Sequence, residues 1–136
     1  MKNRISSLVL SLILPIIILI PRAALAEHIA MTATGEYTMG DNDTYIEAKQ
    51  LALQDAKHIL FKNIETYIGS KTGVSIGDIG PYLPGMVDIE EIGAARTILK
   101  NKTIVATVIV KALVDPDAIM GQVASLRDKK DIEASA

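Results

Sequence analysis

Residues 44–68 read TYIEAKQLALQDAKHILFKNIETYI, and this stretch determines the fold. Thr44 and Glu47 have the spacing of a capping box, in which each side chain accepts a hydrogen bond from the other residue's backbone N–H. Small and apolar residues then recur at every fourth position, at Ala48, Ala52, Ala56 and Leu60. Charged and amide side chains mostly take the opposite side, so the pattern predicts an amphipathic helix whose small-residue ridge packs closely on a sheet. We expect Gly69 to end this helix as its cap.

A strand is predicted before this helix. Residues 28–39 alternate between apolar and polar side chains, which is the pattern of a half-buried strand. The apolar side consists of Ile29, Met31, Ala33, Tyr37 and Met39. Residues 40–43, Gly-Asp-Asn-Asp, then predict a turn between the strand and the helix.

Residues 92–100 and 103–114 predict a β-hairpin that turns at Asn101 and Lys102. In this register one face collects apolar and small residues, which we expect to pack against the alanine ridge of the helix. They are Gly93, Ala95, Thr97, Leu99, Ile104, Ala106, Val108 and Val110. A one-residue slip would turn this set to the other face, so the alternation fixes the register.

The other face of the hairpin mixes apolar with polar side chains. It contains Ile92, Arg96, Ile98, Val105, Thr107, Ile109 and Lys111. This set is too apolar for a fully wet surface and too polar for a core, and such a face can mark a surface that binds a partner. The alternative is that a second helix covers it, and the sequence leaves both interpretations open.

A second helix is predicted from Asp115, with Pro116 at its first position. Residues 70–88 are rich in glycine and proline and predict an irregular connection with a short helical turn near residues 75–79. The expected fold class is therefore α+β. A short antiparallel sheet carries one long helix and a second C-terminal helix, in the order β-α-β-β-α. We expect one domain over residues 27–128 and a flexible tail over residues 129–136.

The N-terminus predicts export. The first four residues carry two positive charges, and residues 5–20 form an almost unbroken apolar run. Ala24 and Ala26 then give the A-x-A pattern that a signal peptidase accepts. We expect residues 1–26 to be a cleavable signal peptide and Glu27 to be the mature N-terminus.

The alternative is a membrane-tethered subunit in which residues 1–26 persist as an anchor. A spanning helix needs about 20 apolar residues. The apolar run here is shorter and contains Pro15, which favours cleavage. A thioether lipid anchor is excluded because the chain has no cysteine.

The net charge and the absence of cysteine exclude some classes of partner and of catalytic chemistry. Cleavage would remove three of the 14 basic residues and none of the 16 acidic ones, leaving a formal net charge of −5. An acidic chain is a poor partner for nucleic acid or for an anionic lipid surface. The absence of cysteine rules out thiol catalysis, thiolate metal sites and stabilisation by disulfides.

Residues 35–57 resemble a bacterial envelope family. This family comprises the N-terminal domain of flagellar assembly protein T and the small surface lipoproteins of the LPP-twenty type. The shared pattern is a strand ending in Gly-Glu, a turn rich in glycine and aspartate, and a helix carrying Glu-Ala and then an Ala/Leu/Asp-rich stretch. Residues 110–115 resemble the family's last strand and the start of its final helix. The resemblance spans most of residues 29–120 and implies a sheet-and-helix domain used in envelope or flagellar assembly, without catalytic residues.

Three carboxylates, Asp41, Asp43 and Glu47, lie close together before and inside the long helix. Oxygen clusters of this kind can bind calcium, but the spacing lacks the glycine and the distal glutamate of a calcium loop. We therefore expect Asp43 or Thr44 to cap the helix. The two histidines, His28 and His58, have no neighbouring pattern of a triad or metal pair. The pair Glu90–Glu91 should point to opposite faces of a strand.

The sequence thus predicts a non-enzymatic protein without cofactor or bound metal. We expect an exported module, periplasmic or secreted, that binds an envelope protein or further copies of itself, with a flagellar or outer-membrane-associated role as the resemblance implies. Membrane contact is expected only through residues 1–26 if they are not cleaved. The alternative function is a small periplasmic metal-dependent hydrolase that uses Asp41, Asp43 and Glu47.

Overall fold

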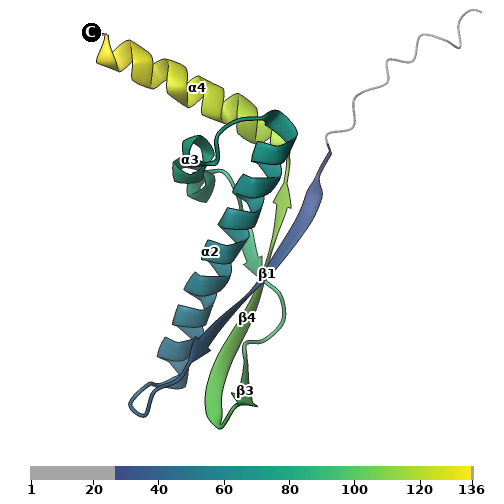
Figure 1. Cartoon of the computed structure of the whole chain (residues 1–136), viewed down its shortest axis with the longest axis vertical. Helices are drawn as coiled ribbons and strands as arrows, with labels where there is room; N and C mark the ends of the chain where they lie inside the picture. Colours follow the sequence, from purple (N-terminus) through teal and green to yellow (C-terminus); the bar gives the residue numbers. More distant parts are fainter. Residues whose placement is uncertain (1–26, 136) are drawn as a thin grey trace, which may run out of the picture.

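The computed structural model describes residues 27–135, and it confirms an α+β fold (Figure 1). The expected signal peptide, with Ala24 and Ala26, lies outside the described residues. The elements in chain order are β1 (Ile29–Thr38), α2 (Tyr45–Thr72), α3 (Ile76–Ile79), the 3-10 helix η2 (Gly80–Gly85), β2 (Ile89–Glu91), β3 (Arg96–Lys100), β4 (Thr103–Val114) and α4 (Pro116–Ala134). Among residues 27–135, none of the helices combines the length and the apolar character that crossing a membrane requires.

The long strand β4 forms the centre of an antiparallel sheet. Strand β1 pairs with one edge of β4 over its whole length, from Ile29 opposite Val114 to Thr38 opposite Val105. Strands β2 and β3 pair in succession with the other edge. The sheet is therefore three strands wide where β2 or β3 lies opposite β1 across β4, and β1 forms one of its outer edges.

The hairpin between β3 and β4 turns at Asn101 and Lys102, as predicted. Both residues adopt left-handed backbone angles, with φ of 50° and 65°. Such angles at both central residues are typical of the two-residue turns whose twist matches that of a hairpin. The register is the predicted one, with Ile98 opposite Val105 and Thr97 opposite Ala106.

The first strand of this hairpin was predicted as one piece over residues 92–100, and this prediction is wrong. The chain instead forms β2 and β3, separated by a bend at which Gly93 has a φ of 71°. The left-handed glycine turns the chain, although the Ile92 N–H still donates to the Ile109 carbonyl oxygen at 2.8 Å. Gly93 is exposed and does not lie beneath the long helix as expected.

Helix α2 packs along one face of the sheet with the predicted ridge of small residues. Its buried residues are Ala48, Ala52, Ala56, Leu60, Ile64 and Ile68. They join a core with the alternate, inward-facing residues of the strands, which include Ala33, Ala106, Val108, Val110, Ala112 and Val114. The alanines in the N-terminal half of the ridge let the helix backbone approach β1 closely. The larger side chains Leu60, Ile64 and Ile68 fill the space between the C-terminal half of α2 and the rest of the core.

The end of α2 differs from the prediction. The helix continues through Gly69 to Thr72, and Gly73 caps it in the left-handed conformation with a φ of 68°. The Gly73 N–H donates to the Gly69 carbonyl oxygen at 2.9 Å. A left-handed residue is needed only where the helix stops, so a glycine four residues earlier can remain helical while the buried Ile68 holds its turn against the core.

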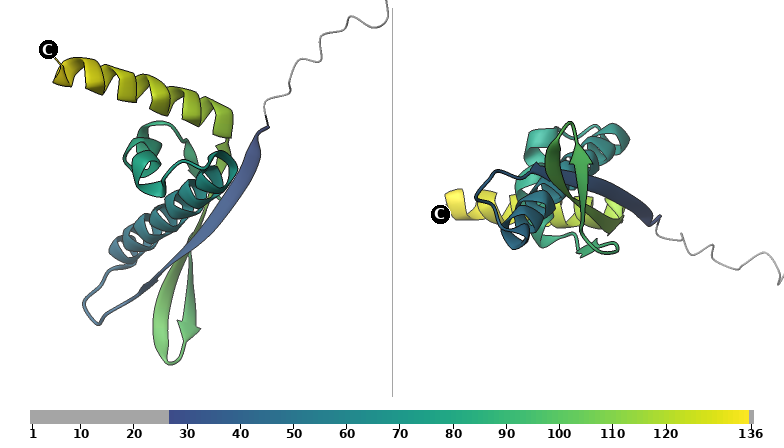
Figure 2. Two further views of the ribbon diagram at one scale, coloured as in Figure 1. Left: turned by 45° about the horizontal axis from the view of Figure 1, so that its top comes forward. Right: turned by 90° about the horizontal axis from the view of Figure 1, so that it is seen from below.

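Helix α4 begins as predicted, because the Asp115 carboxylate accepts a hydrogen bond from the Ala118 N–H at 3.1 Å and Pro116 occupies the first turn. It lies across the end of the sheet beside α2 and α3 (Figures 1 and 2). Its Arg127 forms an ion pair with Asp78 of α3 at 2.7 Å. Residues 129–134, expected to be part of a flexible tail, continue this helix with exposed side chains.

Candidate functional site

The face of the sheet opposite α2 is the candidate site, and we call it the open face. It comprises the alternate residues of β4 from Val105 to Leu113 and their neighbours on the adjacent strands. Strand β1 contributes Ala30, Thr32, Thr34, Glu36 and Thr38, and the other edge contributes Glu90, Ile92, Arg96 and Ile98.

All seven residues predicted as a partner surface lie together on the open face. Their apolar side chains remain exposed: Ile92 is 39% exposed, Ile98 43% and Ile109 44%. Val105 is buried, and Thr107 and Lys111 are half-buried. The alternative that a second helix covers this face is therefore wrong, because α4 packs at the end of the sheet instead.

The sequence prediction missed Leu113, Glu90 and all the β1 residues of this face. Leu113 is 63% exposed and lies two residues beyond Lys111 on the same face of β4. Thr34 lies opposite Ile109 on β1. Extending the period-two alternation of β4 by one step would have found Leu113. Thr34 could not be found in this way, because the pairing of β1 with β4 is a long-range contact.

A shallow depression of about 310 Å³ lies at the middle of the open face. It is lined by Thr34, Ile92, Arg96, Ile98, Thr107 and Ile109. The Thr107 hydroxyl donates to the backbone carbonyl oxygen of Arg96 at 3.3 Å, which ties β3 to β4 at this point. The Arg96 guanidinium forms no ion pair with any residue that the structure describes. The depression thus offers apolar contacts beside one available positive charge.

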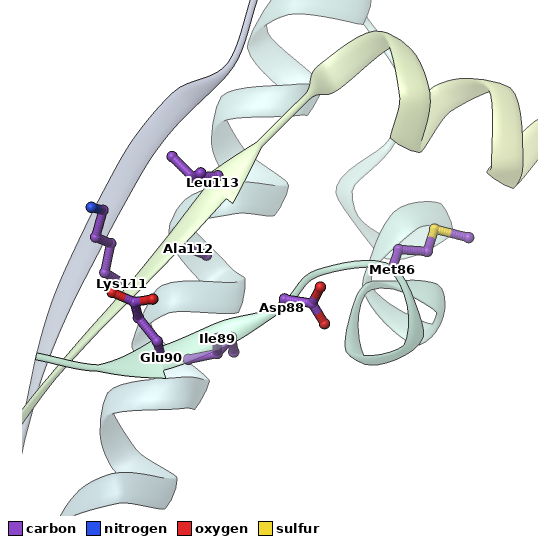
Figure 3. Close-up of a pocket in the computed structure, with 7 residues that line it drawn as sticks. All are labelled: Met86, Asp88, Ile89, Glu90, Lys111, Ala112 and Leu113. Atoms are coloured by element: carbon purple, nitrogen blue, oxygen red, sulfur yellow. The ribbon is translucent and has the colours of Figure 1, made fainter.

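A second depression, of about 320 Å³, lies nearer the start of β2 (Figure 3). Lys111 and Glu90 occupy opposite positions on neighbouring strands, and both side chains project on the open face. Asp88 and Met86 approach from the connection that follows η2. This end of the open face carries both signs of charge beside the exposed Leu113, so it forms a charged border to the apolar centre.

Two of the three carboxylates near the start of α2, Asp43 and Glu47, have structural partners, and the third, Asp41, is exposed. One oxygen of Asp43 accepts hydrogen bonds from the Tyr37 hydroxyl at 3.0 Å and the Gly40 N–H at 2.6 Å. Glu47 accepts from the Thr44 N–H at 3.1 Å, and Thr44 caps the helix in return. Of the two predicted caps, Thr44 is the one observed, and Asp43 shapes the turn.

These hydrogen bonds shift two pKa values. The Thr44 backbone N–H, followed by its hydroxyl, holds the pKa of the Glu47 carboxyl below its ordinary value. The hydrogen bond to Asp43 raises the pKa of the Tyr37 hydroxyl. Across residues 27–135, no three histidine, cysteine, aspartate or glutamate side chains converge as the ligands of a metal ion.

The remaining candidates lie apart from one another. His28 is exposed at the start of β1, and His58 is exposed on α2. Glu91 forms an ion pair with Lys49 of α2 at 3.3 Å, whereas Glu90 projects on the open face. The expectation that these adjacent glutamates point to opposite faces is confirmed. None of these four residues adds a reactive group to the centre of the open face.

Comparisons of this chain with protein-family models, with curated proteins and with solved structures found no match.

Proposed function

We propose that this chain is an exported, non-catalytic binding or assembly module of the bacterial envelope, and that the open face is the surface that contacts its partner. One observation carries the proposal. Ile92, Ile98 and Ile109 lie together and exposed on a sheet face that no described helix covers. Single exposed apolar residues are ordinary, but a contiguous group on one face indicates a surface that is buried in a complex.

The chemistry of the open face indicates what the partner should offer. Its apolar centre requires an apolar counterpart, and the unpaired guanidinium of Arg96 favours a carboxylate placed beside that counterpart. Arginine is common at interfaces because its planar group can bind a carboxylate through two hydrogen bonds. The partner surface that fits is therefore apolar with an acidic residue at its centre.

The envelope location rests on the sequence. Residues 1–26 carry the charge, apolar and small-residue pattern of an export signal. The resemblance of residues 35–57 to the envelope family supports the same location and an assembly role. The order of elements is compatible with the compact sheet-and-helix domain that this resemblance implies.

Site-specific photocrosslinking in the host envelope tests the proposal. A photoreactive amino acid replaces Ile98 on the open face, and a control variant carries it at Lys57, which is exposed on α2. We expect a discrete crosslinked product from position 98 and none from position 57. Equal products from both positions, or none from either, would contradict the assignment of the open face as the binding surface.

A further inference from the structure

One edge of strand β1 pairs with no other strand among residues 27–135. Just beyond the end of β1, the Met39 N–H donates to the Ile104 carbonyl oxygen at 2.8 Å. The odd-numbered residues of β1 therefore direct their backbone N–H and C=O groups toward β4. The Glu36 N–H instead donates to the Asp55 carboxylate of α2 at 3.0 Å. In an antiparallel ladder, a residue's N–H and C=O point to the same neighbour and alternate along the strand. The even-numbered residues of β1 therefore direct their backbone groups outward.

Asp55 closes this edge at one position only. It occupies the outward N–H of Glu36, whereas no described residue bonds the outward backbone groups of Ala30, Thr32 and Thr34. All three residues are exposed. In Figure 1 the N-terminal half of β1 extends away from α2. An open edge of this kind is a template for pairing with another extended strand.

We propose that two copies of this chain pair antiparallel through the β1 edge, with Thr32 on the two-fold axis. Because only even-numbered residues point outward, this register places Thr32 opposite Thr32 of the second copy and Ala30 opposite its Thr34. The central Thr32 pair and the two Ala30–Thr34 pairs each then exchange two backbone hydrogen bonds. A register centred on Thr34 would instead require the Glu36 N–H, which Asp55 already occupies.

The side chains favour a second copy as the occupant. Residues 29–35 carry no charge, so two acidic chains can meet here without opposing like charges. Threonines lie opposite each other at the centre, and cross-strand threonine pairs are favourable. At each end His28 lies opposite Glu36 of the second copy, a pair that can form a hydrogen bond. Asp55 of each chain then marks where the pairing stops.

This pairing would join the two sheets into one and bring the two open faces side by side. It does not depend on the partner proposed for the open face, because the edge and the face use different atoms. A failure of one proposal therefore leaves the other intact. Pairing of strand edges is also an established mode of recognition between folded proteins.

Disulfide trapping tests the register directly, because the chain contains no cysteine of its own. Thr32→Cys places two thiols on the two-fold axis, with their Cα atoms about 5.5 Å apart as in a hydrogen-bonded pair, which a disulfide can span. Thr34→Cys is the matched control, because its two copies would lie about 13 Å apart, four residues along the strand. The exported protein should form a covalent dimer on mild oxidation with Thr32→Cys and remain uncrosslinked with Thr34→Cys. Equal crosslinking of both variants, or of neither, would overturn the proposal.

A second variant tests the backbone hydrogen bonds. Thr32→Pro removes an N–H that points away from β4, and proline is tolerated on edge strands in this position. Light scattering should show a dimer for the unmodified exported chain, and its dissociation constant should rise at least about tenfold in Thr32→Pro. An unmodified chain that is monomeric at all accessible concentrations would overturn the proposal. So would a Thr32→Pro variant that folds and dimerises unchanged.

Discussion

Gly35 of β1 lies directly beneath Ala52 of α2, so close that a Cβ atom on Gly35 would overlap the Ala52 carbonyl oxygen. The same Cβ atom would also overlap the backbone nitrogen of Ala56. Backbone atoms cannot move aside as the end of a flexible side chain can. This contact sets the distance between the long helix and the sheet.

Gly35→Ala should therefore separate the helix from the sheet. We expect it to lower the free energy of unfolding by about 1–3 kcal/mol or more, the usual cost of overpacking a core. Gly121→Ala is the control, because a Cβ there meets nothing within 4 Å and the residue lies in α4. It should be neutral or stabilising by up to about 1 kcal/mol. Similar losses in both variants, measured by urea denaturation, would contradict the close approach.

The small-residue ridge gives a second prediction. Ala52→Leu or Ala56→Leu should cost about 1–3 kcal/mol, because both alanines are fully buried. Leucine at Gln50 or Lys57, both exposed on α2, should change stability by less than about 0.5 kcal/mol. Denaturant midpoints of the four variants provide the comparison. Equal effects at all four positions would mean that the outer side of α2 is buried too, and midpoints that depend on protein concentration would show that an oligomer buries it.

The acidic cluster before α2 should be structural. Asp43→Ala removes the acceptor for Tyr37 and Gly40, so we expect a loss of about 0.5–1.5 kcal/mol. Asp41→Ala, at an exposed residue, should change stability by less than about 0.5 kcal/mol. Melting temperatures should not respond to calcium. A rise with calcium that either substitution abolishes would instead support a metal site.

The capping box should make stability depend on acid. The folded-state pKa of Glu47 is depressed, so its charged form is favoured by folding. The resulting stabilisation is present above the unfolded pKa of a glutamate and is lost as the pH falls through the lower folded value. Glu47→Gln keeps a capping side chain without the titration. Its unfolding free energy should therefore fall less steeply than that of the unmodified chain on acidification below about pH 4.5. Parallel acid curves would contradict this.

Local patterns in the sequence predicted the elements and most of their faces, because alternation and four-residue spacing are set by backbone geometry. The expectation that Thr97, Leu99 and Ile104 pack against α2 is wrong, because all three are exposed. These patterns correctly predicted the register of the β3–β4 hairpin and the buried ridge of α2. The extension of α2 past Gly69 did not, because both Gly69 and Gly73 can end a helix and only packing around Ile68 decides between them. Whether the open face was covered could not be predicted either. It depends on where α4 lies, and long-range contacts such as Arg127 with Asp78 help to fix that position.

We propose that the open face binds a partner and is not part of the core. The most direct measurement is the yield of the crosslinked product from position 98 when Ile109, on the same face, is replaced by aspartate. Because Ile109 is exposed, Ile109→Asp should lower the unfolding free energy by no more than about 1 kcal/mol. We expect the folded variant to lose the product, with a yield no higher than that of the Lys57 control. An undiminished yield from folded Ile109→Asp protein would contradict it.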